Sequence, residues 1–262
     1  MAEIKPQVYK DDRPAEYFDR FHRRARDHRP GFVYTATRCL VTVISLFLYR
    51  TRATGTENVP AEGPVLLAPN HFSQMDHFFA GLYLRRQVRI MAKSQLFGVR
   101  GLTWIFYFGG IFPVRRGHRD EEAFTTVRTL FEQGGAVMVY AEGGRSRSSE
   151  LGEPRHGIGR MALESGIPVV PVSINGSAAV RRWRKLFFPK VTVQYGSPLV
   201  FPVDPEATRE RQQEVAEEIF DETRRLYYDL EERGRTAILR EGRERWREIR
   251  RALRRNAGRP DQ

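Results

Sequence analysis

The stretch NHFSQMDHFF, residues 70–79, places His71 and Asp76 five residues apart. This spacing does not suit neighbours on one helical face, which are three or four residues apart, and it does not match the H-E-x-x-H zinc motif. It suits a strand–turn–helix junction, because the chain bends between the two residues. Ser73 fits the N-cap of the helix, and Asp76 three residues later completes a capping-box-like pattern. We therefore expect His71 in the turn to meet Asp76 in the first helical turn.

Such a pair can act as a general base. A carboxylate that holds one imidazole nitrogen allows the other nitrogen to take a proton from a hydroxyl. His71 and Asp76 would form the His–Asp part of a serine-hydrolase triad, but the sequence contains no G-x-S-x-G nucleophile elbow. Either the substrate brings its own hydroxyl, or the two side chains only cap a turn and a helix. Taken alone, the residues leave both interpretations open.

Two later stretches suit an anionic ligand. GGIFPVRRGHRD, residues 109–120, ends a strand candidate with two arginines, whose fork-shaped guanidinium groups suit phosphate or carboxylate. VYAEGGRSRSSE, residues 139–150, runs from a strand into glycines that let backbone N–H groups approach a ligand oxygen, and Arg145 adds charge. The P-loop pattern is absent. Each stretch could equally be an ordinary basic loop.

Strands and helices that alternate must position these stretches. Short apolar runs bounded by Gly, Pro or Asn predict strands, and residues 118–135 have the acidic start and glycine stop of a helix. The alternation predicts an α/β fold, with a mostly parallel or mixed central sheet flanked by helices. Pro168 and Pro171 in one apolar run predict an edge strand or an irregular strand end. The strand candidates are residues 63–70, 88–93, 110–114, 135–143, 167–174 and 191–198.

The chain divides into three predicted segments. Residues 1–50 form an N-terminal helical membrane-docking segment, residues 51–203 the catalytic domain, and residues 204–262 a charged C-terminal helical extension. Arg38 interrupts the apolar residues 31–50, and the uninterrupted part is shorter than the roughly 20 residues that span a bilayer. We favour a helix in the membrane interface over a core helix or a marginal span.

The C-terminal extension is dense in Glu and Arg. Val215, Ile219, Leu226 and Leu230 recur at helical spacing, which predicts a solvated helix with one packed stripe. The alternative is a helix that touches anionic lipid through its arginines. Cys39 is the single cysteine and is expected to pack in the apolar run. With no second cysteine the chain cannot form an internal disulfide, which fits a reducing compartment.

Composition limits the class of partner. The chain has 262 residues, of which 40% are hydrophobic, so it can bury a core. The net charge of +12 favours a lipid surface, a nucleic acid or a phosphorylated substrate. The absence of RNP1, KH and zinc patterns argues against nucleic acid. The polar first residues, about thirty, do not fit a secretory signal peptide.

Four stretches in series carry a family resemblance. NHFSQMD, GGIFPVRRG, YAEGGRS and IPVVPVSI resemble, in this order, the four blocks of the glycerolipid acyltransferase family, the 1-acylglycerol-3-phosphate acyltransferases. The resemblance covers roughly residues 51–203. It implies acyl transfer from acyl-CoA or acyl carrier protein to a hydroxyl of a lysophosphatidate-like acceptor, which makes phosphatidate in phospholipid biosynthesis. It implies no metal and no bound cofactor, and a location on the cytoplasmic face of the membrane, peripheral or monotopic.

The resemblance also implies a role for each matching residue. His71 would be the general base and Asp76 its orienting partner, and the turn around His71 is a candidate source of N–H donors for the oxyanion. Pro171 would be structural. The residues implied to hold the acceptor phosphate or shape its pocket are Lys93, Arg116, Glu142, Gly143 and Arg145.

Four positions depart from the family pattern. Tyr140-Ala141 stands where Phe-Pro is usual, Gly144 where Thr is usual, and Arg115 where an acidic residue is frequent. These departures are compatible with acyl transfer, but they leave the identity of the acceptor open. The alternatives are another lysophospholipid, a lipid glycoside, or a non-catalytic membrane-binding protein with a degenerate acyltransferase fold.

Overall fold

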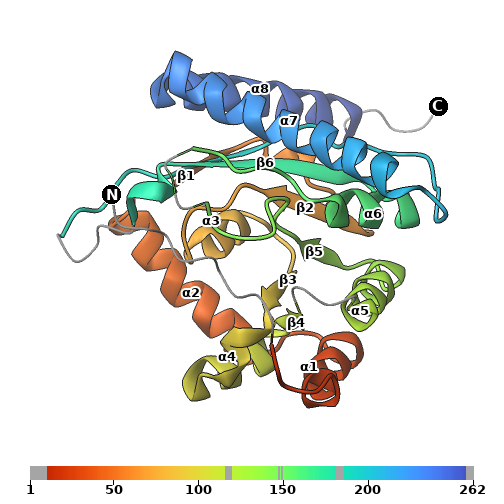
Figure 1. Cartoon of the computed structure of the whole chain (residues 1–262). Helices are drawn as coiled ribbons and strands as arrows, with labels where there is room; N and C mark the ends of the chain where they lie inside the picture. The colour runs from red at the N-terminus through yellow and green to blue at the C-terminus, as the bar shows by residue number, and fades with distance from the viewer. Residues whose placement is uncertain (1–10, 116–119, 147, 149, 181–185, 258–262) are drawn as a thin grey trace.

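A single mixed sheet organises the chain. The computed structural model describes residues 11–115, 120–146, 148, 150–180 and 186–257 (Figure 1). Across these residues the strand order is β1-β7-β6-β2-β5-β3-β4. The strands from β6 to β4 in this order run parallel, whereas β7 is antiparallel to β6 and parallel to β1. The strands are β1 Arg52–Thr54, β2 Val65–Pro69, β3 Val88–Lys93, β4 Phe112–Val114, β5 Ala136–Met138, β6 Val169–Asn175 and β7 Thr192–Tyr195.

Helices cover both faces of this sheet, which confirms the predicted α/β fold (Figure 1). Every residue of β2 is buried. Leu66 points into a core formed with α5, α6 and α7, whereas Leu67 points into a core formed with α3. Burial on both faces explains why these strands are apolar throughout. The helices are α1 Glu16–Asp27, α2 Phe32–Phe47, α3 Asp76–Leu82, α4 Arg100–Gly109, α5 Glu121–Glu132, α6 His156–Ser165, α7 Arg209–Arg233 and α8 Arg235–Ala257, with 3-10 turns η1 Thr56–Asn58 and η2 Ser94–Gly98.

The predicted strands all form, although β5 is shorter than expected, and the edge strand β1 was not predicted. Of the two alternatives drawn from Pro168 and Pro171, the edge strand was wrong, because β6 lies between β7 and β2. Pro168 lies at a strand end, directly before the first residue of β6. The Pro171 carbonyl accepts a hydrogen bond from Gly196 N at 2.8 Å. The N and C=O groups of one strand residue face the same neighbouring strand, so the Pro171 nitrogen, which has no proton, also faces β7. It does so just beyond Tyr195, where β7 ends. A central strand tolerates proline there because no ladder bond is required.

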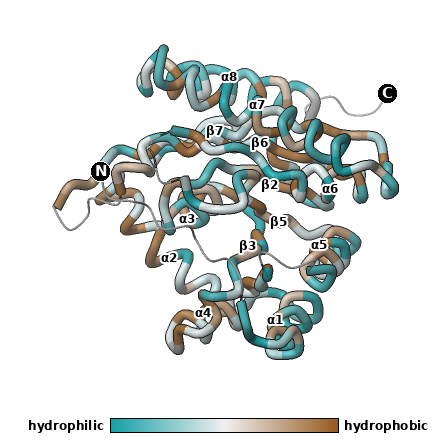
Figure 2. The backbone as a smooth tube through the Cα atoms, in the orientation of Figure 1, coloured by the Kyte–Doolittle hydropathy of each residue, from teal (hydrophilic) through white to brown (hydrophobic). Residues whose placement is uncertain are grey.

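The N-terminal helices pack beside the sheet rather than within it. Only Ser45 of α2 is fully buried, so α2 is not a core helix. Phe32 is 85% exposed and Phe47 is 77% exposed, and much of α2 is hydrophobic (Figure 2). Cys39 is exposed, so the prediction that it packs was wrong. Among the described residues no single helix is long and apolar enough to cross a membrane. Only α1 and α2 taken together have that length and apolarity, and the two helices are bent by 86° relative to each other.

Arg38 fixes α2 to the end of α3. Its guanidinium group donates hydrogen bonds to the carbonyl oxygens of Leu82, Leu84 and Arg86, at and beyond the end of α3. These carbonyls would otherwise lack partners at a helix C-terminus, where a cation is also favoured by the helix dipole. The arginine that interrupts the apolar run thus has a structural role.

The C-terminal extension forms two helices, not one. α7 buries Val215 and Ile219 in the core shared with the sheet and α6, and it also buries Leu230, whereas Leu226 of the predicted stripe is half-buried. Gly234, with φ of +79°, ends α7, and α8 turns back along β1. Both helices are mainly hydrophilic (Figure 2). The three-segment division of the chain stays a prediction.

Candidate active site

His71 and Asp76 meet at the end of β2 as the spacing predicted. The chain turns after Pro69, and α3 begins at Asp76. His71 Nδ1 lies 3.0 Å from Asp76 Oδ2. The aspartate is fully buried and the histidine side chain is 14% exposed. With its proton on Nδ1, the imidazole carries its lone pair on Nε2, the tautomer that a general base needs.

Asp76 also holds the turn itself. Its Oδ2 accepts hydrogen bonds from Phe72 N and Ser73 N, both at 2.7 Å. The predicted capping box does not form, because α3 begins at Asp76 and its N-cap is Met75, so the prediction that Ser73 is the N-cap was wrong. Ser73 Oγ instead accepts from Met75 N at 3.2 Å, before the helix begins. One carboxylate oxygen therefore orients the imidazole and two backbone N–H groups.

Glu142 holds the turn from the other side. Its Oε1 accepts from His71 N at 2.6 Å and its Oε2 from Gly152 N at 2.9 Å. The carboxylate is 7% exposed. Burial raises the pKa of Glu142 to about 7, against the opposing effect of these two N–H groups. The N–H groups of residues 71 to 73 thus all donate to carboxylates, so the expectation that this turn supplies oxyanion donors was wrong.

Tyr140 stacks on the ring of His71. Its ring lies 3.8 Å from the His71 ring between centroids, with an interplanar angle of 18°. The Tyr140 hydroxyl is buried and has no hydrogen-bond partner among the described residues. Burial raises the pKa of Tyr140 well above its usual value, so the group stays protonated. A buried hydroxyl without a partner costs about 1–3 kcal/mol, which a substrate oxygen would recover.

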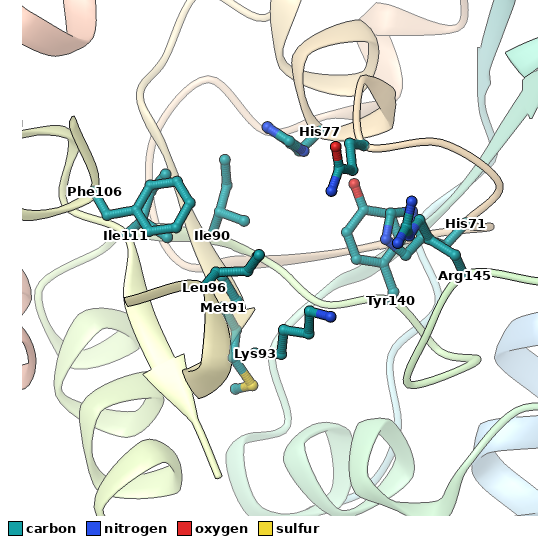
Figure 3. Close-up of a pocket in the computed structure, with 12 residues that line it drawn as sticks. His71, His77, Ile90, Met91, Lys93, Leu96, Phe106, Ile111, Tyr140 and Arg145 are labelled. Carbon is teal, nitrogen blue, oxygen red and sulfur yellow. The ribbon is translucent and has the colours of Figure 1, made fainter. Parts of the chain in front are cut away.

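The His71 pocket opens where β2, β3 and β5 end, as expected for a site at the carboxyl edge of parallel strands. It has a volume of about 90 Å³. Figure 3 shows Lys93 extending toward the side of the pocket where His71, Tyr140 and Arg145 lie. His77 also lines the pocket and is half-buried. Burial lowers the pKa of His77 to about 4, so its imidazole is neutral near pH 7. The pocket combines one base with two cations.

An apolar cavity of about 300 Å³ adjoins the His71 pocket. It lies between α2, α3 and α4, and it shares Gln74, His77, Leu96 and Phe106 with the pocket, among other residues. Its walls are largely aliphatic and aromatic side chains. A hydrocarbon chain placed there would have its end beside His71.

The predicted site residues take different positions around this pocket. His71, Lys93 and Arg145 line it. Glu142 lies beneath the His71 turn, and Gly143 lines a neighbouring cavity instead. Arg116 lies outside the described residues. Asp76 is buried behind His71, as an orienting residue should be.

The sequence interpretation missed the contributions of Tyr140, Gln74 and His77 to the pocket. For Tyr140 a signal was present. It follows the β5 strand, and β5 pairs with β2 in parallel, so residues after both strands meet at one edge of the sheet. A tyrosine shortly after β5 therefore had to lie near the turn that follows β2.

Comparisons with known proteins agree with this geometry. Residues 50–175 match the family model described as Acyltransferase. The chain is 25% identical over 166 residues to the chloroplastic 1-acyl-sn-glycerol-3-phosphate acyltransferase BAT2 of Brassica napus, covering 62% of this chain and 46% of the relative. It is 28% identical over 134 residues to human 1-acyl-sn-glycerol-3-phosphate acyltransferase beta, and this match covers 50% of this chain and 48% of the relative. The chain thus spans less than half the length of either relative.

The fold is shared with solved structures. Among them is the 1-acyl-sn-glycerophosphate acyltransferase PlsC from Thermotoga maritima, with a TM-score of 0.55 and 21% sequence identity over 82% of this chain and 89% of that chain. The recognition made from the four sequence blocks is confirmed by the family model over residues 50–175 together with these relatives.

Proposed function

We propose, from the membership of residues 50–175 in the acyltransferase family, that the protein moves a fatty acyl group from a thioester to the free hydroxyl of a lysophosphatidate-like acceptor. The thioester is acyl-CoA or acyl carrier protein, and the product is phosphatidate. The observation that carries the proposal is the His71–Asp76 contact of 3.0 Å at the mouth of a pocket with two cations and an adjoining apolar cavity.

The chemistry follows from the positions of these groups. His71 Nε2 takes the proton of the acceptor hydroxyl as its oxygen attacks the thioester carbonyl carbon. The carbon–oxygen bond forms, and the carbonyl oxygen becomes an oxyanion. When the carbon–sulfur bond breaks, the imidazolium returns the proton to the departing thiolate. Asp76 stabilises the imidazolium between these two steps.

Tyr140 is the proposed donor to the oxyanion. The N–H groups of the His71 turn already donate to Asp76 and Glu142, whereas the Tyr140 hydroxyl is buried without a partner among the described residues. Because the two rings stack face to face, the hydroxyl and the imidazole can reach one small reacting group. One such donor is typically worth about 10²–10³ in rate.

Lys93 and Arg145 are the proposed ligands of the acceptor phosphate, since both line the pocket. Arg116 is proposed to join them, by its place in the second sequence block. A phosphate held between cations would direct the adjacent hydroxyl toward His71. The acyl chain of the donor would lie in the apolar cavity.

Membrane attachment is proposed through the exposed apolar side chains of α2 and α4. Phe32, Leu40 and Phe47 of α2 and Trp104 of α4 are each more than half exposed, and α2 forms one wall of the apolar cavity. The stretch RRWRKLFF, residues 181–188, is also proposed to favour an anionic surface. Its residues 181–185 lie outside the described residues, and Phe187 is 49% exposed. We propose a peripheral or monotopic location on the cytoplasmic face of the membrane.

An acceptor panel tests the function. Purified protein is given radiolabelled palmitoyl-CoA with lysophosphatidate, glycerol 3-phosphate, other lysophospholipids or lipid glycosides. We expect the fastest transfer to lysophosphatidate, and His71→Ala should lower it about 10²–10⁴-fold. His28→Ala, at an exposed histidine outside the pocket, is the matched control. A folded protein that binds liposomes but acylates none of these acceptors would instead be a non-catalytic binding protein.

A further inference from the structure

A second cavity adjoins the His71 pocket on the sheet face that α5 and α6 cover. It has a volume of about 390 Å³, and Met91 and Tyr140 line both it and the pocket. Its walls come from the ends of β3, β4 and β5 and from the starts of α5 and α6. We call it the Arg155 cavity. The apolar cavity, by contrast, lies against α2, α3 and α4.

The Arg155 cavity carries a net positive charge among the described residues, because Arg115 and Arg155 line it with one carboxylate, Asp120. Neither guanidinium group has an ion pair in the described part of the chain, although Arg115 Nη2 donates to the Arg13 carbonyl oxygen at 3.3 Å and Arg155 is exposed. The Arg115 Nε is buried without a hydrogen-bond partner there. Asp120 also lines the cavity, but its oxygens accept the N–H groups of Arg115 at 2.6 Å and Ala123 at 3.4 Å. The carboxylate thus binds backbone rather than either guanidinium group.

The glycine-rich turn positions Arg155. Arg155 N donates to Ala141 O at 2.9 Å, which ties it to the end of β5. Its side chain crosses Gly143, which has φ of +64°, and a Cβ at Gly143 would come within 2.7 Å of Arg155 Cδ. Gly143 therefore permits the left-handed turn and leaves room for the Arg155 side chain. The turn that supports His71 through Glu142 also places this arginine.

The start of α6 adds to the unbalanced charge. Asp120 caps α5, and its first turn has Glu121 and Glu122. In contrast, α6 follows Arg155 without a side-chain cap and has no acidic residue in its first turn, which begins with His156. Cations at a helix N-terminus are unfavourable, and an anion there is favourable. Together with Arg155 and Arg115, which have no carboxylate partner among the described residues, this arrangement leaves the cavity suited to an anion.

We propose that the Arg155 cavity binds a phosphate ester group of a substrate, separate from the phosphate beside His71, with Arg115 and Arg155 as its ligands. The group belongs either to the nucleotide end of a coenzyme A donor or to the headgroup of an acceptor. Met91, Phe124 and Met161 provide an apolar wall for the rest of that moiety. The identity of the substrate rests on the proposed function, but binding of the phosphate ester does not require transfer.

Direct binding to the full chain tests the proposal without any turnover. Isothermal titration calorimetry would use adenosine 3′,5′-bisphosphate for the coenzyme A source and glycerol 3-phosphate for the headgroup source. Arg155→Ala should weaken one of these probes about tenfold or more, because a charge-assisted contact is lost. Arg115→Ala should weaken the same probe. Arg225→Ala, an exposed arginine of α7 that does not line the cavity, should bind both probes as the wild type does.

Steady-state kinetics show whether the phosphate ester bound in the Arg155 cavity belongs to coenzyme A or to the acceptor headgroup. If the cavity holds coenzyme A, Arg155→Ala raises the KM for acyl-CoA about tenfold, with kcat within twofold and an unchanged KM for an acyl-pantetheine thioester. If it holds the headgroup, the KM for the acceptor rises instead.

Two results would overturn the proposal. The first is that neither probe binds the wild type at millimolar concentration. The second is that both probes bind Arg155→Ala and Arg115→Ala as tightly as the wild type. Loss of transfer with probe binding intact would instead reject the proposed function alone, so the two failures are distinguishable.

Discussion

Replacement of Asp76 by asparagine removes the negative charge of the side chain but keeps its shape. The amide oxygen of the introduced side chain can occupy the position of Oδ2 and still accept from His71 Nδ1, Phe72 N and Ser73 N. The turn therefore stays folded. What disappears is the negative charge that faces the imidazolium formed during proton transfer. The variant should lose rate rather than structure.

The contact distance sets the size of the loss. Two unit charges 3.0 Å apart attract by about 5–6 kcal/mol at an effective dielectric constant of about 20. At about 1.4 kcal/mol per factor of ten, this is a ceiling of about 10⁴ in rate. General-base assistance is typically worth about 10²–10⁴ in total. We therefore expect kcat for Asp76→Asn to fall about 10²–10⁴-fold, and no further than for His71→Ala.

A double-mutant comparison tests the reasoning. Thiol release from palmitoyl-CoA with lysophosphatidate gives the rates of both single variants and of the double variant. If Asp76 acts only through His71, the double variant should be as slow as His71→Ala, since residues that act as a unit are not additive. Circular dichroism and urea unfolding check the fold. A double variant ten times slower than His71→Ala, or wild-type activity in Asp76→Asn, would refute the assigned roles.

Three further predictions concern other parts of the site. The pKa of Glu142 is raised from 4.5 to about 7 in the folded state, so the free energy of unfolding should fall by about 3 kcal/mol as the pH rises through that interval; urea unfolding across this range should show a flatter dependence for Glu142→Gln. Tyr140→Phe should lower kcat about 10²–10³-fold with little change in KM for the acceptor, and an unchanged kcat would remove Tyr140 from the oxyanion site. Phe32→Ser with Phe47→Ser should reduce flotation with anionic liposomes, because each removes exposed apolar surface; Tyr228→Ser, at an exposed position on α7, is the control, and equal flotation of all variants would exclude α2 as the docking face.

The parts of the fold with strong local signals were predictable. The strand β3 matches its predicted bounds, residues 88–93, because its apolar run is bounded by polar and turn residues. The helix α5 begins at the acidic cluster and ends before the glycines, as its caps indicated. The His71–Asp76 contact followed from the spacing and the junction. In each case the information lies within about ten neighbouring residues.

The remaining features depend on partners distant in sequence. β1 has three residues and becomes a strand only by pairing with β7, so no local pattern marks it. Pro171 is tolerated in β6 because β7 ends beside it. The N–H groups of the His71 turn looked available for an oxyanion, but Glu142, 71 residues later, accepts one of them. Such long-range pairings are not visible in the local pattern of a single sequence.

The attachment of Arg38 to the end of α3 has a consequence for regioselectivity. α2 carries the exposed apolar side chains, and the three carbonyl contacts join it without a hinge to the helix that starts at Asp76. If α2 rests on a bilayer, the reacting imidazole then sits at a set height above the acyl chains. In that arrangement an acceptor hydroxyl would be selected partly by its depth among the headgroups, that is, by its position along the membrane normal.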